Sequence, residues 1–213
     1  LAKVGSIHPH TKFTANVYTV TFDANGATVA SAIANITATF GGSIAIPTVT
    51  NKYSKTGYTF LGWNTDKDAT SEIAALVGTI DVSTLVREVG LATPYAPATI
   101  ALYAIWKANT YTVNYVTAGG TSITSVTATY DKAYAFGTTS RVGYTFAGFT
   151  ATGLNTATAK YGDGTTWTAW SNGTPAVTAT QFMNLASEQG AIVVLTAKWN
   201  ANTNTEYTVK HFT

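Results

Sequence analysis

The chain has 213 residues, of which 12 are Lys or Arg, 10 are Asp or Glu, 3 are His and none is Cys. Only 10% of the residues are charged, against about 25% in an ordinary soluble domain, whereas 46% are hydrophobic and 12% aromatic. This composition excludes charge-driven disorder, a disulfide scaffold and a Cys-ligated zinc site, and it argues against a nucleic-acid partner because the basic residues form no cluster.

Two local features concern processing and membrane contact. The lead segment 1–16 lacks the apolar stretch of a signal peptide. No apolar run approaches the roughly 18 residues of a membrane helix. We therefore expect no membrane span in this chain.

The first strand-like segment alternates strictly. Tyr18, Val20 and Phe22 alternate with Thr19 and Thr21. A period of two places the apolar side chains on one face of a β-strand and the threonines on the other.

Further along the chain, Gly57–Trp63 alternates in the same way, with a turn expected at Gly57 and a bulge or close approach at Gly62. The segment 100–106 is apolar at nearly every position, which predicts a central strand covered on both faces.

One helix is expected in each half of the chain. In 81–90 the apolar positions 82, 85, 86 and 89 form one helical face, with Asp81 as the expected N-cap and Gly90 as the terminating residue. In 180–190, Phe182, Leu185 and Ala186 match the same positions when the terminal glycines are aligned. The sequence therefore predicts a second short helix over 180–190.

Four sequence blocks recur in the same order. The segment 18–22 recurs at 111–115, 38–40 at 128–130, 57–63 at 143–149, and 102–107 at 195–200. A third copy of the first block occupies 207–211. Recurrence at this scale indicates tandem structural modules. The third copy predicts the first strand of a third module, so we expect the chain to be a fragment of a longer protein or the end of an array.

We therefore expect a lead segment at 1–16, a first module at 17–107, a linker at 108–110, a second module at 111–200, and a linker with the first strand of a third module at 201–213. The short polar linkers favour modules placed end to end.

The blocks 18–26, 57–63 and 102–106 resemble the Listeria–Bacteroides repeat, the internalin B-repeat-like module of bacterial surface proteins. The resemblance covers about two thirds of each module, and Gly57–Trp63 is its most specific part. It implies a mainly β (α+β) fold of two tandem β-grasp-like modules, each a small mixed sheet with one short helix. These modules exceed 90 residues, and Phe149 stands where the pattern has Trp.

The resemblance also implies a function. We expect non-enzymatic repeat modules in an extracellular protein of the bacterial cell surface, with a stalk or spacer role and an adhesive role as its extension. The expected partners are neighbouring repeats of the same chain, together with a host or cell-surface protein or glycan. The family has no catalytic residues or cofactor to carry over.

Searching the residues for chemistry gives few candidates. The only histidines, at 8, 10 and 211, lie near the termini, so none of them falls inside either module as a base for nucleophilic catalysis. Asp66, Asp68 and Glu72 could supply oxygen ligands to Ca²⁺. They form only a weak candidate site, since they lack the spacing of a known calcium loop, and a solvated turn is the simpler interpretation. Asp163 is interpreted as a turn residue.

Aromatic residues supply the alternative function. Tyr161, Trp167 and Trp170 lie in a Gly- and Thr-rich stretch and would bind a glycan or a protein if they are exposed; otherwise at least one tryptophan packs on the core. Apolar and aromatic residues of the recurring blocks are assigned to a structural core. That predicted core consists of Tyr18, Val20, Phe22, Tyr58, Phe60, Trp63, Leu102, Trp106, Tyr111, Val113, Tyr144, Phe146, Leu195 and Trp199.

Overall fold

The computed structural model describes residues 12–91, 98–172 and 177–203. The chain divides into two compact units. The first unit contains 1–54 and 60–105, and the second contains 55–59 and 106–213. The described chain is mainly β, as expected, and one short helix accompanies its strands. The three histidines and the third copy of the repeat at 207–211 lie outside the described residues.

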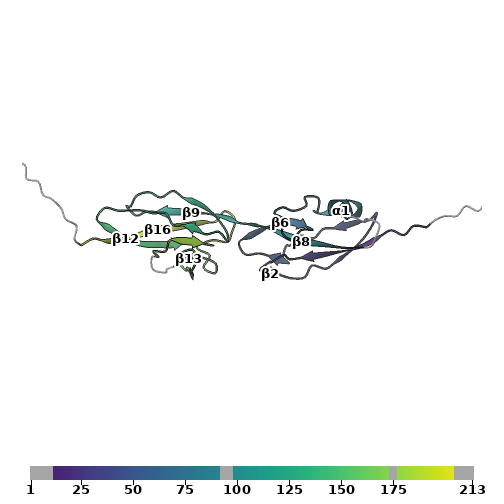
Figure 1. The fold of residues 1–213 in the computed structure, drawn as a ribbon, viewed down its shortest axis with the longest axis horizontal. Helices are drawn as coiled ribbons and strands as arrows, with labels where there is room; N and C mark the ends of the chain where they lie inside the picture. The colour runs from purple at the N-terminus through teal and green to yellow at the C-terminus, as the bar shows by residue number, and fades with distance from the viewer. Residues whose placement is uncertain (1–11, 92–97, 173–176, 204–213) are drawn as a thin grey trace, which may run out of the picture. The chain divides into compact units, whose positions relative to one another are not determined.

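A four-stranded sheet forms the centre of the first unit. Its strands are β1 (Val17–Asp23), β3 (Ile36–Thr39), β6 (Tyr58–Asn64) and β8 (Thr99–Ala108), in the order β3-β1-β8-β6. Figure 1 labels β6 and β8. β1 runs antiparallel to β3 and parallel to β8. Two short pairs accompany this sheet: β2 (Val29–Ala30) with β5 (Tyr53–Ser54), and β4 (Ser43–Ala45) with β7 (Thr79–Asp81).

The alternation seen in the sequence places the core of this sheet. Tyr18 and Val20 are fully buried while Thr19 between them is exposed. β8 lies between β1 and β6, which confirms the central strand expected at 100–106. Gly62 is a point of close approach, because a Cβ atom there would lie 2.6 Å from Cβ of Glu72.

The first predicted helix is confirmed as α1 (Val82–Glu88), the coiled ribbon in Figure 1. It buries Val82, Leu85 and Val86, and Gly90 beyond its end has a φ of 65°. Asp81 occupies the N-cap position as expected, but the expected capping by its side chain is wrong, because that side chain makes no hydrogen bond to the helix. That carboxylate instead accepts a hydrogen bond of 3.2 Å from the hydroxyl of Ser43, its partner across the β4–β7 pair.

The second unit has a sheet of the same order. Its strands are β9 (Thr110–Val116), β10 (Val126–Thr129), β12 (Tyr144–Thr152) and β16 (Ile192–Ala201), arranged β10-β9-β16-β12. β9 is antiparallel to β10 and parallel to β16, and β12 is antiparallel to β16. Figure 1 labels β9, β12 and β16. The register of β12 shifts between Phe146 and Gly148, where Gly148 has a φ of 106° that suits glycine.

The second predicted helix, over 180–190, is wrong. Gln181–Met183 form strand β15, which joins β11 (Tyr134–Ala135), β13 (Lys160–Gly162) and β14 (Trp167–Ala169) in a further sheet of order β11-β15-β13-β14. Phe182, Leu185 and Ala186 are buried, as a helix would have required. The segment reaches the core in extended form because β11 and β13 offer it a sheet partner on each side, and this pairing overrides the helical pattern.

Candidate functional site

The aromatic platform proposed from the sequence does not form, because Trp170 lies in the core. Its side chain is 0% exposed and packs edge-on against Phe136, with ring centroids 5.8 Å apart. Tyr161 is half-buried and packs edge-on against Trp170 at 5.8 Å. Trp167 is half-buried on β14. The sheet β11-β15-β13-β14 thus turns a Gly- and Thr-rich stretch, which looks like a surface loop in sequence, into a cover for the core.

Trp170 has a second unusual property. Among the described residues, no acceptor lies within hydrogen-bond distance of its buried Nε1. Trp63, a fully buried indole of the first unit, donates from Nε1 to the carbonyl of Pro47 at 2.9 Å. Since a buried donor without a partner costs about 1–3 kcal/mol, the two tryptophans contribute differently to stability.

The acidic loop does not form a cation site. Asp66 Oδ1 accepts from the backbone N–H of Asp68 at 3.0 Å, and the Asp68 carboxylate pairs with Lys67 at 2.7 Å, both on the surface. Glu72 packs its aliphatic atoms towards Gly62. Within 12–91, 98–172 and 177–203, no group of three His, Asp or Glu side chains is placed to hold a metal ion. The carboxylates therefore serve a turn and a surface ion pair.

Asp163 is the turn residue that the sequence indicates. Its Oδ1 accepts hydrogen bonds from the backbone N–H groups of Thr166 and Thr165 at 2.7 and 2.8 Å, and a third from the Thr165 hydroxyl at 2.8 Å. These donors favour the ionised form and lower the pKa of the carboxyl to about 2.

The predicted structural core divides by burial. Tyr18, Val20, Trp63, Leu102, Tyr111, Val113 and Leu195 are buried, whereas Phe22, Tyr58, Phe60, Trp106, Phe146 and Trp199 are half-buried. The assignment of Tyr144 to the core is wrong, because its side chain is exposed. Its ring centroid lies 3.8 Å from the guanidinium of Arg141. The sequence missed this contact because strand alternation alone does not show that a neighbouring loop places a cation over the ring.

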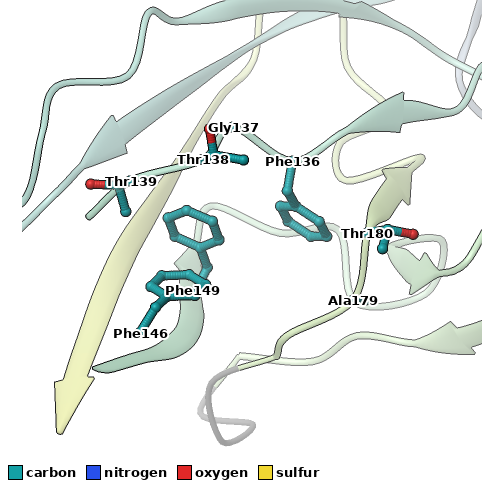
Figure 2. Close-up of a pocket in the computed structure, with 8 residues that line it drawn as sticks. All are labelled: Phe136, Gly137, Thr138, Thr139, Phe146, Phe149, Ala179 and Thr180. Atoms are coloured by element: carbon teal, nitrogen blue, oxygen red, sulfur yellow. The ribbon is translucent and has the colours of Figure 1, made fainter. Parts of the chain in front are cut away.

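A pocket of about 290 Å³ lies in the second unit (Figure 2). Three aromatic rings line it, from Phe136, Phe146 and Phe149, and Figure 2 shows them converging on a common space. The rest of the lining is Gly137, Thr138, Thr139, Ala179 and Thr180. Pockets of this size and lining are typical of sites for small apolar groups.

The rings of this pocket belong to one packed aromatic group. Phe149 lies 4.9 Å from Phe146 in edge-to-face geometry and 5.7 Å from Phe136 in stacked geometry, measured between ring centroids. None of the eight lining residues is titratable. The pocket therefore has the chemistry of an apolar binding site and not of acid–base catalysis. No motif in the sequence marks this pocket, although Phe149 in place of the pattern's Trp is its visible signal.

Comparison with known proteins identifies the first repeat. Residues 18–85 match the family model of the Listeria-Bacteroides repeat domain. This match confirms the resemblance that the sequence blocks show. No solved structure gives a significant match.

Two proteins of Evansella cellulosilytica are similar to the chain. One, named "Putative membrane protein", is 31% identical over 121 residues, which cover 57% of this chain and 15% of that protein. The other, named "Putative Gly-rich membrane protein", is 27% identical over 124 residues, covering 58% of this chain and 13% of that protein. The chain thus spans less than a sixth of either relative. In the part of the chain that the structure describes, no helix is both long and apolar enough to cross a bilayer.

Proposed function

Because residues 18–85 carry a Listeria-Bacteroides repeat domain, we propose that the chain consists of non-enzymatic repeat modules of an extracellular bacterial surface protein. Their role in this proposal is that of a stalk or spacer between other parts of a longer protein. The observation that carries it is the repetition of one sheet, of order β3-β1-β8-β6 in the first unit and β10-β9-β16-β12 in the second. The names of the two similar Evansella proteins are consistent with a location at the cell envelope.

The chemistry of the units supports a structural role. A spacer needs folded modules and few reactive groups, and both units bury a continuous set of apolar side chains. The largest fully buried side chains include Trp63, Tyr18 and Leu102 in the first unit, and Trp170, Tyr111 and Leu195 in the second. Only 10% of the residues of the chain are charged. Such a chain offers little electrostatic steering towards a charged substrate.

The proposal includes a β-grasp-like topology for both units. It is supported by the parallel central pair in each sheet, β1 with β8 and β9 with β16. The outer strands β3, β10 and β12 run antiparallel to their neighbours. Long-range nuclear Overhauser effects between these central strands test the pairing. Contacts that fit an antiparallel β1–β8 or β9–β16 register would contradict it.

Protease shaving of intact cells that produce the full-length host protein tests the location. We expect peptides from residues 17–200 in the released fraction while a cytoplasmic marker protein stays intact. Recovery of these peptides only after lysis would rule out a surface location.

A glycan array and a pull-down with the full chain test the alternative, a binding module that uses Tyr161 and Trp167. If the chain is a spacer, neither experiment should find a ligand whose binding depends on these two rings. Binding that Tyr161→Ala or Trp167→Ala abolishes, with the fold intact by circular dichroism, would replace the spacer with the binding function.

A further inference from the structure

The two units differ at the position where the family pattern has tryptophan. Trp63 and Phe149 end the recurring segments 57–63 and 143–149, and both are buried, at 1% and 2% exposure. In the first unit the indole of Trp63 packs edge-on against Phe60 at 5.4 Å and donates from Nε1 to the Pro47 carbonyl. In the second unit a smaller ring occupies the same place in the repeat.

The wall opposite this ring also has a counterpart. Pro47 and Gly137 each lie nine residues after the alanine of the recurring block, Ala38 or Ala128. Gly137 is therefore the residue that matches the acceptor of the Trp63 indole, and it lines the pocket beside Phe149 (Figure 2). The pocket therefore lies beside the ring that takes the place of the Trp63 indole in the repeat.

The two units also differ in the length of the connection near this position. Gly57 lies 19 residues after Ala38, whereas Gly143 lies 15 residues after Ala128. The longer connection of the first unit carries Tyr53, which is buried and lies edge-on to Trp63 with centroids 6.2 Å apart. The shorter connection of the second unit lines the pocket with Gly137, Thr138 and Thr139, whose side chains are small.

The walls of the pocket are held in place without a ligand. The backbone N–H of Gly137 donates to the hydroxyl of Tyr115 at 3.2 Å. Thr139 Oγ1 donates to the carbonyl of Thr121 at 2.7 Å, and the N–H of Ser140 donates to the Thr121 hydroxyl at 3.0 Å. A preformed pocket loses little conformational entropy when it is filled, which favours binding.

The lining selects the class of occupant. Three phenylalanine rings favour a planar aromatic group, and aromatic pairs add to the gain from area burial alone. No charged side chain lines the pocket, so a free amino acid would bring its own charges without a partner. A cavity of about 150 Å³ lined by apolar side chains already holds benzene, and this pocket has about 290 Å³.

We propose that the pocket between Phe136, Phe146 and Phe149 binds an aromatic side chain, best a tryptophan, presented by a polypeptide partner. The first unit supplies the pattern of the occupied state, in which the indole comes from the chain itself. The second unit thus has a binding site where the first has a core residue. This inference goes beyond a spacer role and does not depend on it.

Titration of the full ¹⁵N-labelled chain with N-acetyl-tryptophanamide, an uncharged peptide-like probe, tests the site. We expect saturable amide shifts at Gly137, Thr138, Thr139 and Thr180, with a dissociation constant on the order of 1 mM for a single side chain. N-acetyl-leucinamide should bind at least about fivefold more weakly because it lacks the ring. No saturable shift, or shifts centred on Tyr161 and Trp167, would overturn the proposal.

Two variants test the geometry. Phe149→Trp restores the repeat pattern and fills the pocket from within, so it should weaken the probe about tenfold or more. Thr138→Trp blocks the pocket from an exposed position and keeps the test valid if Phe149→Trp does not fold. Thr127→Trp, on an exposed position of β10, is the matched control and should leave binding unchanged. Unaltered binding in a folded Phe149→Trp or Thr138→Trp variant would contradict the proposed site.

A further arm of the titration separates the sources of the ring. If the pocket recognises the ring and also accepts the peptide groups attached to it, N-acetyl-tryptophanamide should shift the same amides as free indole. Binding of free indole without binding of the amide would overturn the polypeptide partner and assign the pocket to a small aromatic molecule.

Discussion

Trp63 and Trp170 provide a matched pair of substitutions to phenylalanine. Both indoles are buried, at 1% and 0% exposure, so each substitution removes a similar apolar volume from a core. That shared loss costs about 1–2 kcal/mol. The two differ in hydrogen bonding, because Trp63 Nε1 donates to the Pro47 carbonyl whereas Trp170 Nε1 has no acceptor among the described residues.

The hydrogen-bond difference sets the expected result. Trp63→Phe loses a bond and adds about 1 kcal/mol to the loss, giving about 2–3 kcal/mol in total. Trp170→Phe removes a buried unsatisfied donor and regains about 1 kcal/mol, giving about 0–1 kcal/mol in total. We therefore expect the free energy of opening to fall about 2 kcal/mol further in the first variant.

Amide hydrogen exchange on the full chain, resolved by mass spectrometry, measures each unit separately. Peptides from β8 report the first unit, and peptides from β16 report the second, since both are central strands. An equal or larger loss in Trp170→Phe would refute the reasoning, because it would show that Trp170 Nε1 gains a partner in solution.

Three other expectations follow from single residues. Tyr111→Phe should cost about 1 kcal/mol at pH 7, because its buried hydroxyl accepts from the N–H of Leu185 at 3.2 Å. Burial raises the pKa of Tyr111 to about 12, so the contribution of its hydroxyl to stability is complete below pH 10 and is lost as pH rises through about 12. Urea unfolding midpoints that fall equally in the Tyr111→Phe variant and the unmodified chain over this range would contradict the assignment. The pKa of Asp163 is lowered to about 2, so the turn it stabilises should hold above its ordinary value near 3.8 and open as pH falls through about 2; amide shifts of Thr165 and Thr166 with a midpoint near 3.8 would disprove this. Asp81→Ala should change the unfolding free energy by less than about 0.5 kcal/mol, because its carboxylate does not cap α1, and a loss of about 1 kcal/mol in denaturant titrations would restore the capping role.

Recurrence and alternation predicted much of the fold. The apolar face of 17–23 and the helical face of 82–88 are visible in the sequence, because a strand or helix with one buried side carries its period wherever it lies. Both appear in the structure as β1 and α1. Residues 181–183 failed the same test, since a few apolar positions fit a helix and a short strand alike.

The candidate site was less predictable than the fold. Trp170 was a candidate for an exposed binding residue and is buried, whereas Tyr144 was assigned to the core and is exposed. The burial of Trp170 is not set by its neighbours in sequence. Trp170 is covered by Phe136 and Tyr161, which come from other elements of the second unit, and Tyr144 is met by Arg141 from the turn before it.

The sequence by itself determined the repeated blocks, the period of the main strands and the loss of tryptophan at position 149. Only the tertiary structure decided what that loss produced. A missing indole is either filled by neighbouring side chains or left as space, and the outcome depends on how far those neighbours can move. Here Gly137 and Thr139 are held by hydrogen bonds to Tyr115 and Thr121, so the walls stay apart and a pocket remains beside Phe149.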